Sequence, residues 1–247
     1  MAKRIVELEH TLRARKEEGA LRSVLEWLPP PGHISYTRQQ EPLGLGHAVW
    51  CARNFIGDEP FAVLLADDLI LAKPGCLKQM VDIHREVGGN LVAIEEVPSD
   101  ETSRYGILEP GATKGSLTVA RGVVEKPAPD KAPSRLGIIG RYILEPMVLT
   151  ILEHQERGAG NEIQLTDAMA RAIGLIPFHG LRFDGQRFDC GSKVGYLEAN
   201  IAFALQREDM SERIRQMLAK YVLGDKARSG DEDHSRLADA QAEIVRG

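Results

Sequence analysis

Hydrophobic residues along the chain follow two spacings, one typical of helices and one typical of strands. Apolar residues at helical spacing, Ile5, Leu8 and Leu12 and later Leu21, Val24, Leu25 and Leu28, predict a helix over 3–27 that ends before Pro29. Short apolar runs between turn residues predict strands over 33–39, 61–66, 90–97 and 176–183. Further helices are predicted after the glycine turn at 44–46 and over 73–87, 145–155, 163–174 and 192–207.

The order of these elements predicts an α/β fold. Strands and helices alternate up to residue 97, which is typical of a parallel sheet covered by helices. Between 98 and 144 strand-like pieces are separated by Gly and Pro turns, so a smaller, partly antiparallel region is expected there. The tail over 223–247 is polar and poor in large apolar residues, and we expect it to be loosely ordered or to pack on a partner.

Composition narrows the class of protein. The 247 residues carry a net charge of −5, which argues against nucleic acid or an anionic membrane as a partner. Cys51, Cys76 and Cys190 show no CxxC spacing and are interpreted as thiols of a reducing compartment. No apolar run approaches the length of a membrane span, and the first residues lack a signal-peptide core. We therefore predict a cytoplasmic protein.

The stretch FAVLLADDLI places two aspartates at the end of a very apolar strand. Ligands of open parallel sheets bind outside the carboxyl ends of the strands, where Asp67 is expected, and a carboxylate there can hold Mg²⁺. Asp67 and Asp68 can equally cap the following loop. A P-loop NTPase is excluded because no GxxxxGK[ST] occurs.

Three other stretches can carry chemistry. In RQQEPLGLGHAV, Gln39 can read a nucleobase edge and Gly44 lets a ligand approach a helix N-terminus, although a tight turn explains the glycines equally well. In VVEKP, Glu125 and Lys126 can serve one site only if the strand ends there; otherwise they are a solvated pair. In RFDCGSK, Asp189 either supports a helix cap or faces the same cation as Asp67.

Taken in order, these stretches resemble the sugar-nucleotide pyrophosphorylases, and among them the bacterial UTP–glucose-1-phosphate uridylyltransferases. The likeness runs over about residues 7–220 and includes RQQEPLGLGHAVWCAR, FAVLLADDLI, SRYGILEP, VVEKP, NEIQLTDAM and FDCGSKVGYLEAN. It implies a Rossmann-like nucleotide-diphospho-sugar transferase fold, a mixed sheet with helices on both faces, occupying 1–222. It also implies UTP and glucose 1-phosphate as substrates, and a homo-oligomer is expected.

The resemblance implies roles for individual residues. Gln39 and Gly44 correspond to the contacts with uracil, and Asp67 and Asp189 to the two carboxylates that hold Mg²⁺. At the other end of the substrate, Gly106 in SRYG and Glu125 correspond to the contacts with glucose, and Lys126 to the lysine on the sugar phosphate. Asp67, Lys126 and Asp189 are thus the expected catalytic residues. The sugar phosphate itself is the nucleophile, so catalysis consists of positioning and charge neutralisation.

The chain departs from the family pattern at its start. The family begins with a strand, a glycine-rich GTR-type loop that cradles the UTP phosphates, and a second strand, but no GxGTR occurs in the 247 residues. We therefore expect an N-terminally truncated fold, with a gap in the sheet between the strands at 33–39 and 61–66 unless these two pair directly. Little or no activity is expected of this chain alone. The alternative is a weak or inactive homologue that acts at most as a sugar-phosphate binding module.

Overall fold

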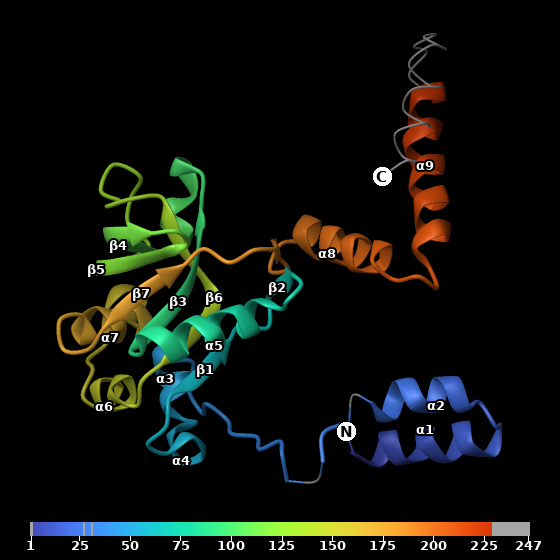
Figure 1. The fold of residues 1–247 in the computed structure, drawn as a ribbon, viewed down its shortest axis with the longest axis horizontal. Helices are drawn as coiled ribbons and strands as arrows, with labels where there is room; N and C mark the ends of the chain where they lie inside the picture. Colours follow the sequence, from blue (N-terminus) through green and yellow to red (C-terminus); the bar gives the residue numbers. More distant parts are fainter. Residues whose placement is uncertain (1, 27, 31, 229–247) are drawn as a thin grey trace. The chain divides into compact units, whose positions relative to one another are not determined.

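The computed structural model describes residues 2–26, 28–30 and 32–228, which fall into two compact units, one ending at Gln40 and the other beginning at Glu41 (Figure 1). The described helices are α1 (Ala2–Ala14), α2 (Glu18–Leu25), α3 (Leu45–Trp50), α4 (Arg53–Ile56), α5 (Cys76–Val87), α6 (Met147–Glu153), α7 (Leu165–Ala172), α8 (Lys193–Leu205) and α9 (Ser211–Arg228), with the 3₁₀ turns η1 (Ser99–Arg104) and η2 (Ala159–Asn161). The described strands are β1 (Phe61–Leu64), β2 (Asp68–Leu71), β3 (Asn90–Glu96), β4 (Gly106–Lys114), β5 (Leu117–Glu125), β6 (Leu136–Leu144), β7 (Phe178–Leu181) and β8 (Gln186–Asp189).

The first unit differs from the sequence prediction in two ways. The single helix predicted over 3–27 is wrong: Lys16 has a φ of 57°, a left-handed conformation that cannot continue a right-handed helix, and α1 and α2 pack against each other instead. The strand predicted over 33–39 is also wrong, because this segment joins no ladder in the described part of the chain. An alternating pattern makes a strand only when a neighbouring backbone accepts its hydrogen bonds.

The main sheet of the second unit has six strands in the order β1-β6-β3-β7-β5-β4. β3 and β7 are parallel, while β6 runs antiparallel to both β1 and β3 and so separates them. β1, β3 and β7 therefore run in the same direction, as expected, but the antiparallel β6 lies between β1 and β3, so a purely parallel sheet is wrong and the mixed sheet is confirmed. β1 lies at one end of this sheet, so the expected gap between two strands does not arise within the described residues.

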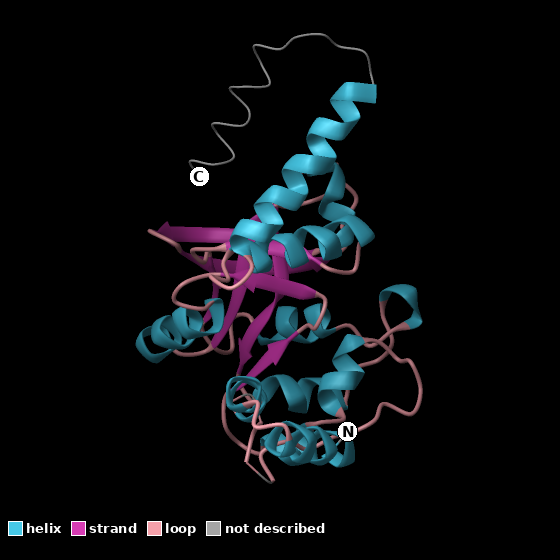
Figure 2. Ribbon diagram, turned by 90° about the vertical axis from the view of Figure 1, so that its right-hand side faces the viewer, coloured by secondary structure: helices cyan, strands magenta, loops and turns pink. Residues whose placement is uncertain are grey.

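Helices cover both faces of this sheet, as predicted, and Figure 2 shows them flanking the strands. Alternating side chains of β3 and β6 enter opposite cores. The core against α5 contains Cys76, Met80, Leu91, Ala93, Ile139, Ile143 and Leu181. The core against α3, α6 and α7 includes Val49, Val92, Ile94, Tyr142, Val148, Leu152, Leu165 and Met169. Every residue of β6 is buried, and its sequence is apolar apart from Arg141, as this two-sided packing requires.

A second, two-stranded sheet was not predicted. β2 and β8 pair antiparallel with Asp68 opposite Asp189, and α8 packs against both strands. Each strand is only four residues long and follows directly after a predicted element, which is why hydrophobic spacing missed them. The pairing joins segments more than a hundred residues apart and fixes the loop that carries Asp67 beside the end of β8.

The remaining predicted helices of the second unit are present as α5, α6, α7 and α8. Ser192 caps α8 as expected, since its hydroxyl accepts the backbone N–H of Gly195 at 3.0 Å. Of the predicted tail, residues 223–228 belong to α9 and the rest lies outside the described residues. Among the helices that the structure describes, none is long and apolar enough to cross a membrane.

Candidate active site

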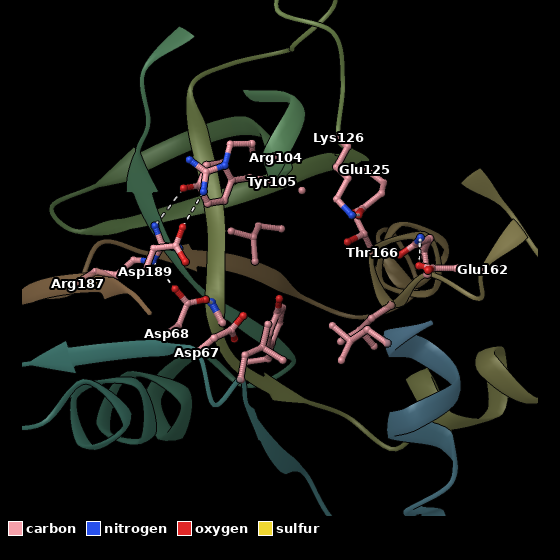
Figure 3. A pocket seen from close by; sticks show the side chains of 18 residues that line it. Asp67, Asp68, Arg104, Tyr105, Glu125, Lys126, Glu162, Thr166, Arg187 and Asp189 are labelled. Carbon is pink, nitrogen blue, oxygen red and sulfur yellow. Dashed lines mark hydrogen bonds and ion pairs between the residues drawn. The ribbon is translucent and has the colours of Figure 1, made fainter. Parts of the chain in front are cut away.

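Polar side chains from several distant segments of the second unit line one open pocket (Figure 3). They come from the loop after β1, the end of η1, the β4–β5 hairpin, the start of α7 and the end of β8. Five residues that the sequence predicts for the site line it: Asp67, Gly106, Glu125, Lys126 and Asp189. The fold therefore gathers residues whose proximity the sequence alone left open.

Asp67 and Asp189 lie at the same end of the pocket. The backbone N–H of Cys190 donates to the carbonyl oxygen of Asp67 at 2.7 Å, which ties the two loops together. A Cβ placed on Gly191 would lie 3.0 Å from Oδ1 of Asp189 and 3.6 Å from Oδ2 of Asp67, so these oxygens are within 6.6 Å of each other, the sum of the two distances.

The surroundings of this pair suit a hard divalent cation. The described residues contain no cluster of three or more His, Cys, Asp or Glu side chains that could enclose a metal ion, so no more than two such side chains meet at this point. Mg²⁺ tolerates such a site because it keeps several waters and takes further oxygens from substrate phosphates. Asp67 is exposed and accepts no side-chain hydrogen bond within the described residues. Asp189 accepts one from the Arg104 guanidinium at 2.7 Å.

Asp68, the neighbour of Asp67, has a different environment. Its side chain is 9% exposed and accepts hydrogen bonds from Arg187 and from the backbone N–H of Gly140, the latter at 3.0 Å. Arg187 also donates to the hydroxyl of Tyr105 at 3.3 Å. Burial lowers the pKa of Arg187, but the hydrogen bond to Tyr105 and the charge of Asp68 outweigh it, so the pKa is raised overall. The carboxylate of Asp68 is thus committed to a protein cation.

These contacts define two groups of residues, which we call the inner cluster (Asp68, Tyr105 and Arg187) and the outer cluster (Asp67, Arg104 and Asp189). The sequence prediction missed Arg104, Tyr105 and Arg187. Each lies within two residues of a predicted site residue, in SRYG or RFD, which is the signal that could have found them.

Glu125 and Lys126 form the other end of the pocket. The strand β5 ends at Glu125, and Lys126 has a φ of 45°, so the chain turns there and both side chains enter one pocket. The backbone N–H of Lys126 donates to the carbonyl oxygen of Tyr105 at 3.0 Å. The Lys126 ammonium lies 3.3 Å from Glu125 Oε1. The strand end that the shared site required is therefore present.

Gly106 faces the same end of the pocket. A Cβ at this position would lie 3.1 Å from the hydroxyl oxygen of Thr166 and 3.4 Å from Oε2 of Glu125. A larger residue would occupy space between these two polar groups, whereas glycine leaves its backbone open to a ligand. Thr166, from the NEIQLTDA stretch, is a further polar group of the pocket that sequence reasoning left unassigned.

Gly44 lies at the N-terminus of α3, beside the pocket residue Leu45. It has a φ of 98°, and a Cβ there would stand 2.8 Å from Cβ of Glu162 and 2.9 Å from the carbonyl oxygen of Ile163. Close packing of two loops is thus one reason for glycine at this position, and its contact with a nucleotide stays a prediction. Gln39 belongs to the first unit, and its role also stays a prediction.

The chain belongs to the nucleotidyl transferase family, whose pattern matches residues 8–205. It is 49% identical over 188 residues to a UTP–glucose-1-phosphate uridylyltransferase of Komagataeibacter xylinus, covering 76% of this chain and 66% of the relative. It is 44% identical over 181 residues to that of Bacillus subtilis, covering 73% of this chain and 62% of the relative. The chain thus spans about two thirds of the length of these relatives.

Solved structures agree with this family. A UDP-glucose pyrophosphorylase complexed with UDP-glucose is 40% identical, with a TM-score of 0.70 over 76% of this chain and 71% of that one. A UTP-bound enzyme of the same kind from Acinetobacter baumannii is 33% identical, with a TM-score of 0.76 over 86% of this chain and 74% of that one. The predicted nucleotide-diphospho-sugar transferase fold is confirmed by this likeness.

Proposed function

We propose that the protein transfers a uridylyl group from UTP to glucose 1-phosphate and releases UDP-glucose and pyrophosphate. The observation that carries this proposal is the single pocket with the Asp67–Asp189 pair at one end and Gly106, Glu125 and Lys126 at the other. A sugar nucleotide needs these two kinds of contact at once, cation-binding oxygens near its phosphates and hydrogen-bonding groups around its sugar. The names of the relatives support the choice of UTP and glucose 1-phosphate.

The reaction demands little covalent chemistry from the protein. An oxygen of the sugar phosphate attacks the α-phosphorus of UTP, and the bond to the β-phosphate breaks as pyrophosphate leaves. A phosphate monoester is already largely ionised at neutral pH, so neither a protein nucleophile nor a strong base is required. The residues instead hold two mutually repelling phosphates in line, and such positioning can account for about 7–11 kcal/mol of barrier lowering.

Each residue has a place in this proposal. Asp67 and Asp189 would hold Mg²⁺, which supplies positive charge to the phosphates when it is bound. Lys126, whose side chain is 54% exposed in the pocket, would bind the incoming sugar phosphate. The backbone of Gly106 and the carboxylate of Glu125 would bind the sugar hydroxyls. Gln39 and Gly44 would bind the uracil.

Binding and turnover together test the proposal. The chain is titrated with glucose 1-phosphate by calorimetry, and pyrophosphate is followed with UTP, glucose 1-phosphate and Mg²⁺ present. We expect Glu125→Ala to weaken glucose 1-phosphate about tenfold or more, as for loss of a hydrogen bond to a charged group. The matched control is Glu109→Ala, which removes an exposed glutamate of the same hairpin outside the pocket. Gln39→Ala is expected to weaken UTP more than the sugar phosphate.

The outcomes separate the alternatives. Turnover that requires all three components supports the transferase, and a rate within about 1–10³ s⁻¹ would contradict the expectation of a weak chain drawn from the missing GxGTR. Binding of glucose 1-phosphate without turnover favours the sugar-phosphate binding module. Absence of binding, or equal losses from Glu125→Ala and Glu109→Ala, would contradict both.

Assembly and location are part of the same proposal. The helix α8 leaves Val194, Tyr196 and Leu197 between 60% and 77% exposed, an apolar surface that a second copy of the chain would cover in a homo-oligomer. Light scattering of the purified chain measures this directly, and a monomeric mass at micromolar concentration contradicts it. A cytoplasmic location accords with three free cysteines.

A further inference from the structure

Arg104 lies directly on one of the two carboxylates predicted to bind the metal ion (Figure 3). Its Nη2 is 2.7 Å from Oδ2 of Asp189, and its Nη1 is 3.3 Å from Glu101. The other oxygen of Asp189 accepts the backbone N–H of Gly191 at 3.0 Å. A divalent cation bridging Asp67 and Asp189 would therefore meet a positive guanidinium already in contact with Asp189.

The two arginines of the pocket differ in how firmly they are held. The side chain of Arg187 is 10% exposed and contacts Asp68, Tyr105 and Glu95. That of Arg104 is 50% exposed, its carboxylate partners Glu101 and Asp189 are 40% and 29% exposed, and its guanidinium lies 5.8 Å from the centre of the Tyr105 ring. Exposed ion pairs are weak and exchange readily, because water and salt compete for them. Arg104 can leave its partner at small cost, whereas Arg187 cannot.

We propose that Arg104 is an exchangeable counter-ion of Asp189, which neutralises this carboxylate until a divalent cation takes its place. The inference rests on the proposed function, since it takes Asp67 and Asp189 as the metal pair. The guanidinium and the cation compete for one carboxylate, so Arg104 weakens metal binding by the free protein. Arg104 is also the last residue of η1, two residues before Gly106, so its release occurs next to the predicted sugar contact.

The test measures metal affinity without turnover. Mn²⁺, which takes the same oxygen ligands as Mg²⁺ and is visible by electron paramagnetic resonance, is titrated into the whole chain without nucleotide. An exposed pair is worth about 0.2–1 kcal/mol, so Arg104→Gln is expected to bind Mn²⁺ more tightly than wild type, by a factor between about 1.4 and 5. Arg104→Lys keeps the charge and should stay close to wild type. Raising the ionic strength should reduce the difference in Mn²⁺ affinity between wild type and Arg104→Gln, because salt screens the ion pair of Arg104 with Asp189.

Two controls make the result specific. Lys126→Gln also removes one exposed positive charge from the pocket, but this lysine pairs with Glu125 and not with Asp189. It should change Mn²⁺ affinity less than Arg104→Gln; equal tightening would mean that only net charge matters and would overturn the proposal. The proposal would also be overturned if wild type and Arg104→Gln bound Mn²⁺ equally well while Asp67→Asn abolished the binding. That result would leave Asp67 and Asp189 as the metal pair. If Asp67→Asn left Mn²⁺ binding unaffected, the assignment of Asp67 and Asp189 as the metal pair would be wrong, and so would the role of Arg104 as a counter-ion.

Discussion

The inner and outer clusters use similar residues for different purposes. Each contains an arginine in contact with an aspartate, and Asp67 and Asp68 are neighbours in the chain. In the inner cluster Asp68 and Arg187 are at most 10% exposed and fully paired, with Tyr105 and a backbone N–H as additional partners. In the outer cluster Asp67 is exposed and Arg104 half exposed.

Burial decides what each pair can do. A buried charge that loses its partner is costly, so the inner cluster is held in one arrangement and can fix β2 and β8 beside the main sheet. An exposed pair contributes little to stability and can exchange partners, which suits a carboxylate that must receive a cation and phosphates. The site therefore combines a rigid inner cluster with an outer cluster whose contacts can exchange. Asp67 and Asp68, one from each cluster, are adjacent in the chain.

The largest effect is expected from Arg187→Met, which keeps most of the apolar stem but leaves Asp68 charged and buried. Breaking a buried pair in this way costs about 3–5 kcal/mol. The measurement is the free energy of unfolding in urea, compared with that of wild type.

Arg104→Met is the matched control for this variant. It breaks an ion pair whose side chains are 50% and 29% exposed, so a change of at most about 1 kcal/mol is expected. Equal losses from the two variants would mean that burial does not distinguish the clusters.

The second effect concerns ligand binding by the outer cluster. Asp67→Asn removes one of two carboxylates from the proposed cation site, and we expect Mn²⁺ binding to weaken at least tenfold, because only one charged ligand remains. The free energy of unfolding should change by less than about 0.5 kcal/mol, as for other surface substitutions.

Asp58→Asn is the control, since Asp58 is an exposed aspartate at the opposite end of β1. Asp58→Asn should leave both the Mn²⁺ affinity and the free energy of unfolding unchanged. A stability loss from Asp67→Asn as large as that from Arg187→Met would mean that Asp67 stabilises the fold as the inner cluster does.

The sequence predicted the positions of helices and strands better than it predicted which strands lie next to each other. Apolar spacing is local, so β3, α5 and α7 were found close to their observed limits. The position of β6 between β1 and β3 depends on which backbone edges meet, and no local pattern encodes that. The helix break at Lys16 depends on a single backbone angle, and it falls in the gap between Leu12 and Leu21 that the helix prediction bridged.

The candidate site shows the same limit. Asp67 was visible because it follows an apolar strand, where a charge is unexpected, whereas Glu125 and Asp189 were assigned through the family resemblance of VVEKP and FDCGSK. The pairing of Asp68 with Arg187 spans 119 residues, and charged residues are common enough that sequence offers no reason to choose this partner. The motifs therefore predicted five residues that line the pocket, while the residues that hold them in place required the structure.

The smallest effect concerns Glu95, at the edge of the inner cluster. Its carboxylate lies 3.7 Å from Arg187 and its side chain is 41% exposed. Burial, together with the charge of Asp68, raises the pKa of Glu95, and Arg187 lowers it by a smaller amount. The folded protein thus retains this proton at pH values where the unfolded chain has lost it. Its contribution to stability is fully present below the unfolded pKa and falls as pH rises through the folded pKa.

Glu95→Gln removes this titration. We expect the variant to be more stable than wild type near pH 7, by at most about 0.5 kcal/mol after allowing for solvent screening, and to lose that advantage near pH 4, where wild-type Glu95 is protonated as well. Urea unfolding at both pH values measures the difference. A variant less stable than wild type near pH 7 would mean that the ionised Glu95 is a net stabilising partner of Arg187. The inner cluster would then extend to a half-exposed residue, and burial alone would no longer separate the two clusters.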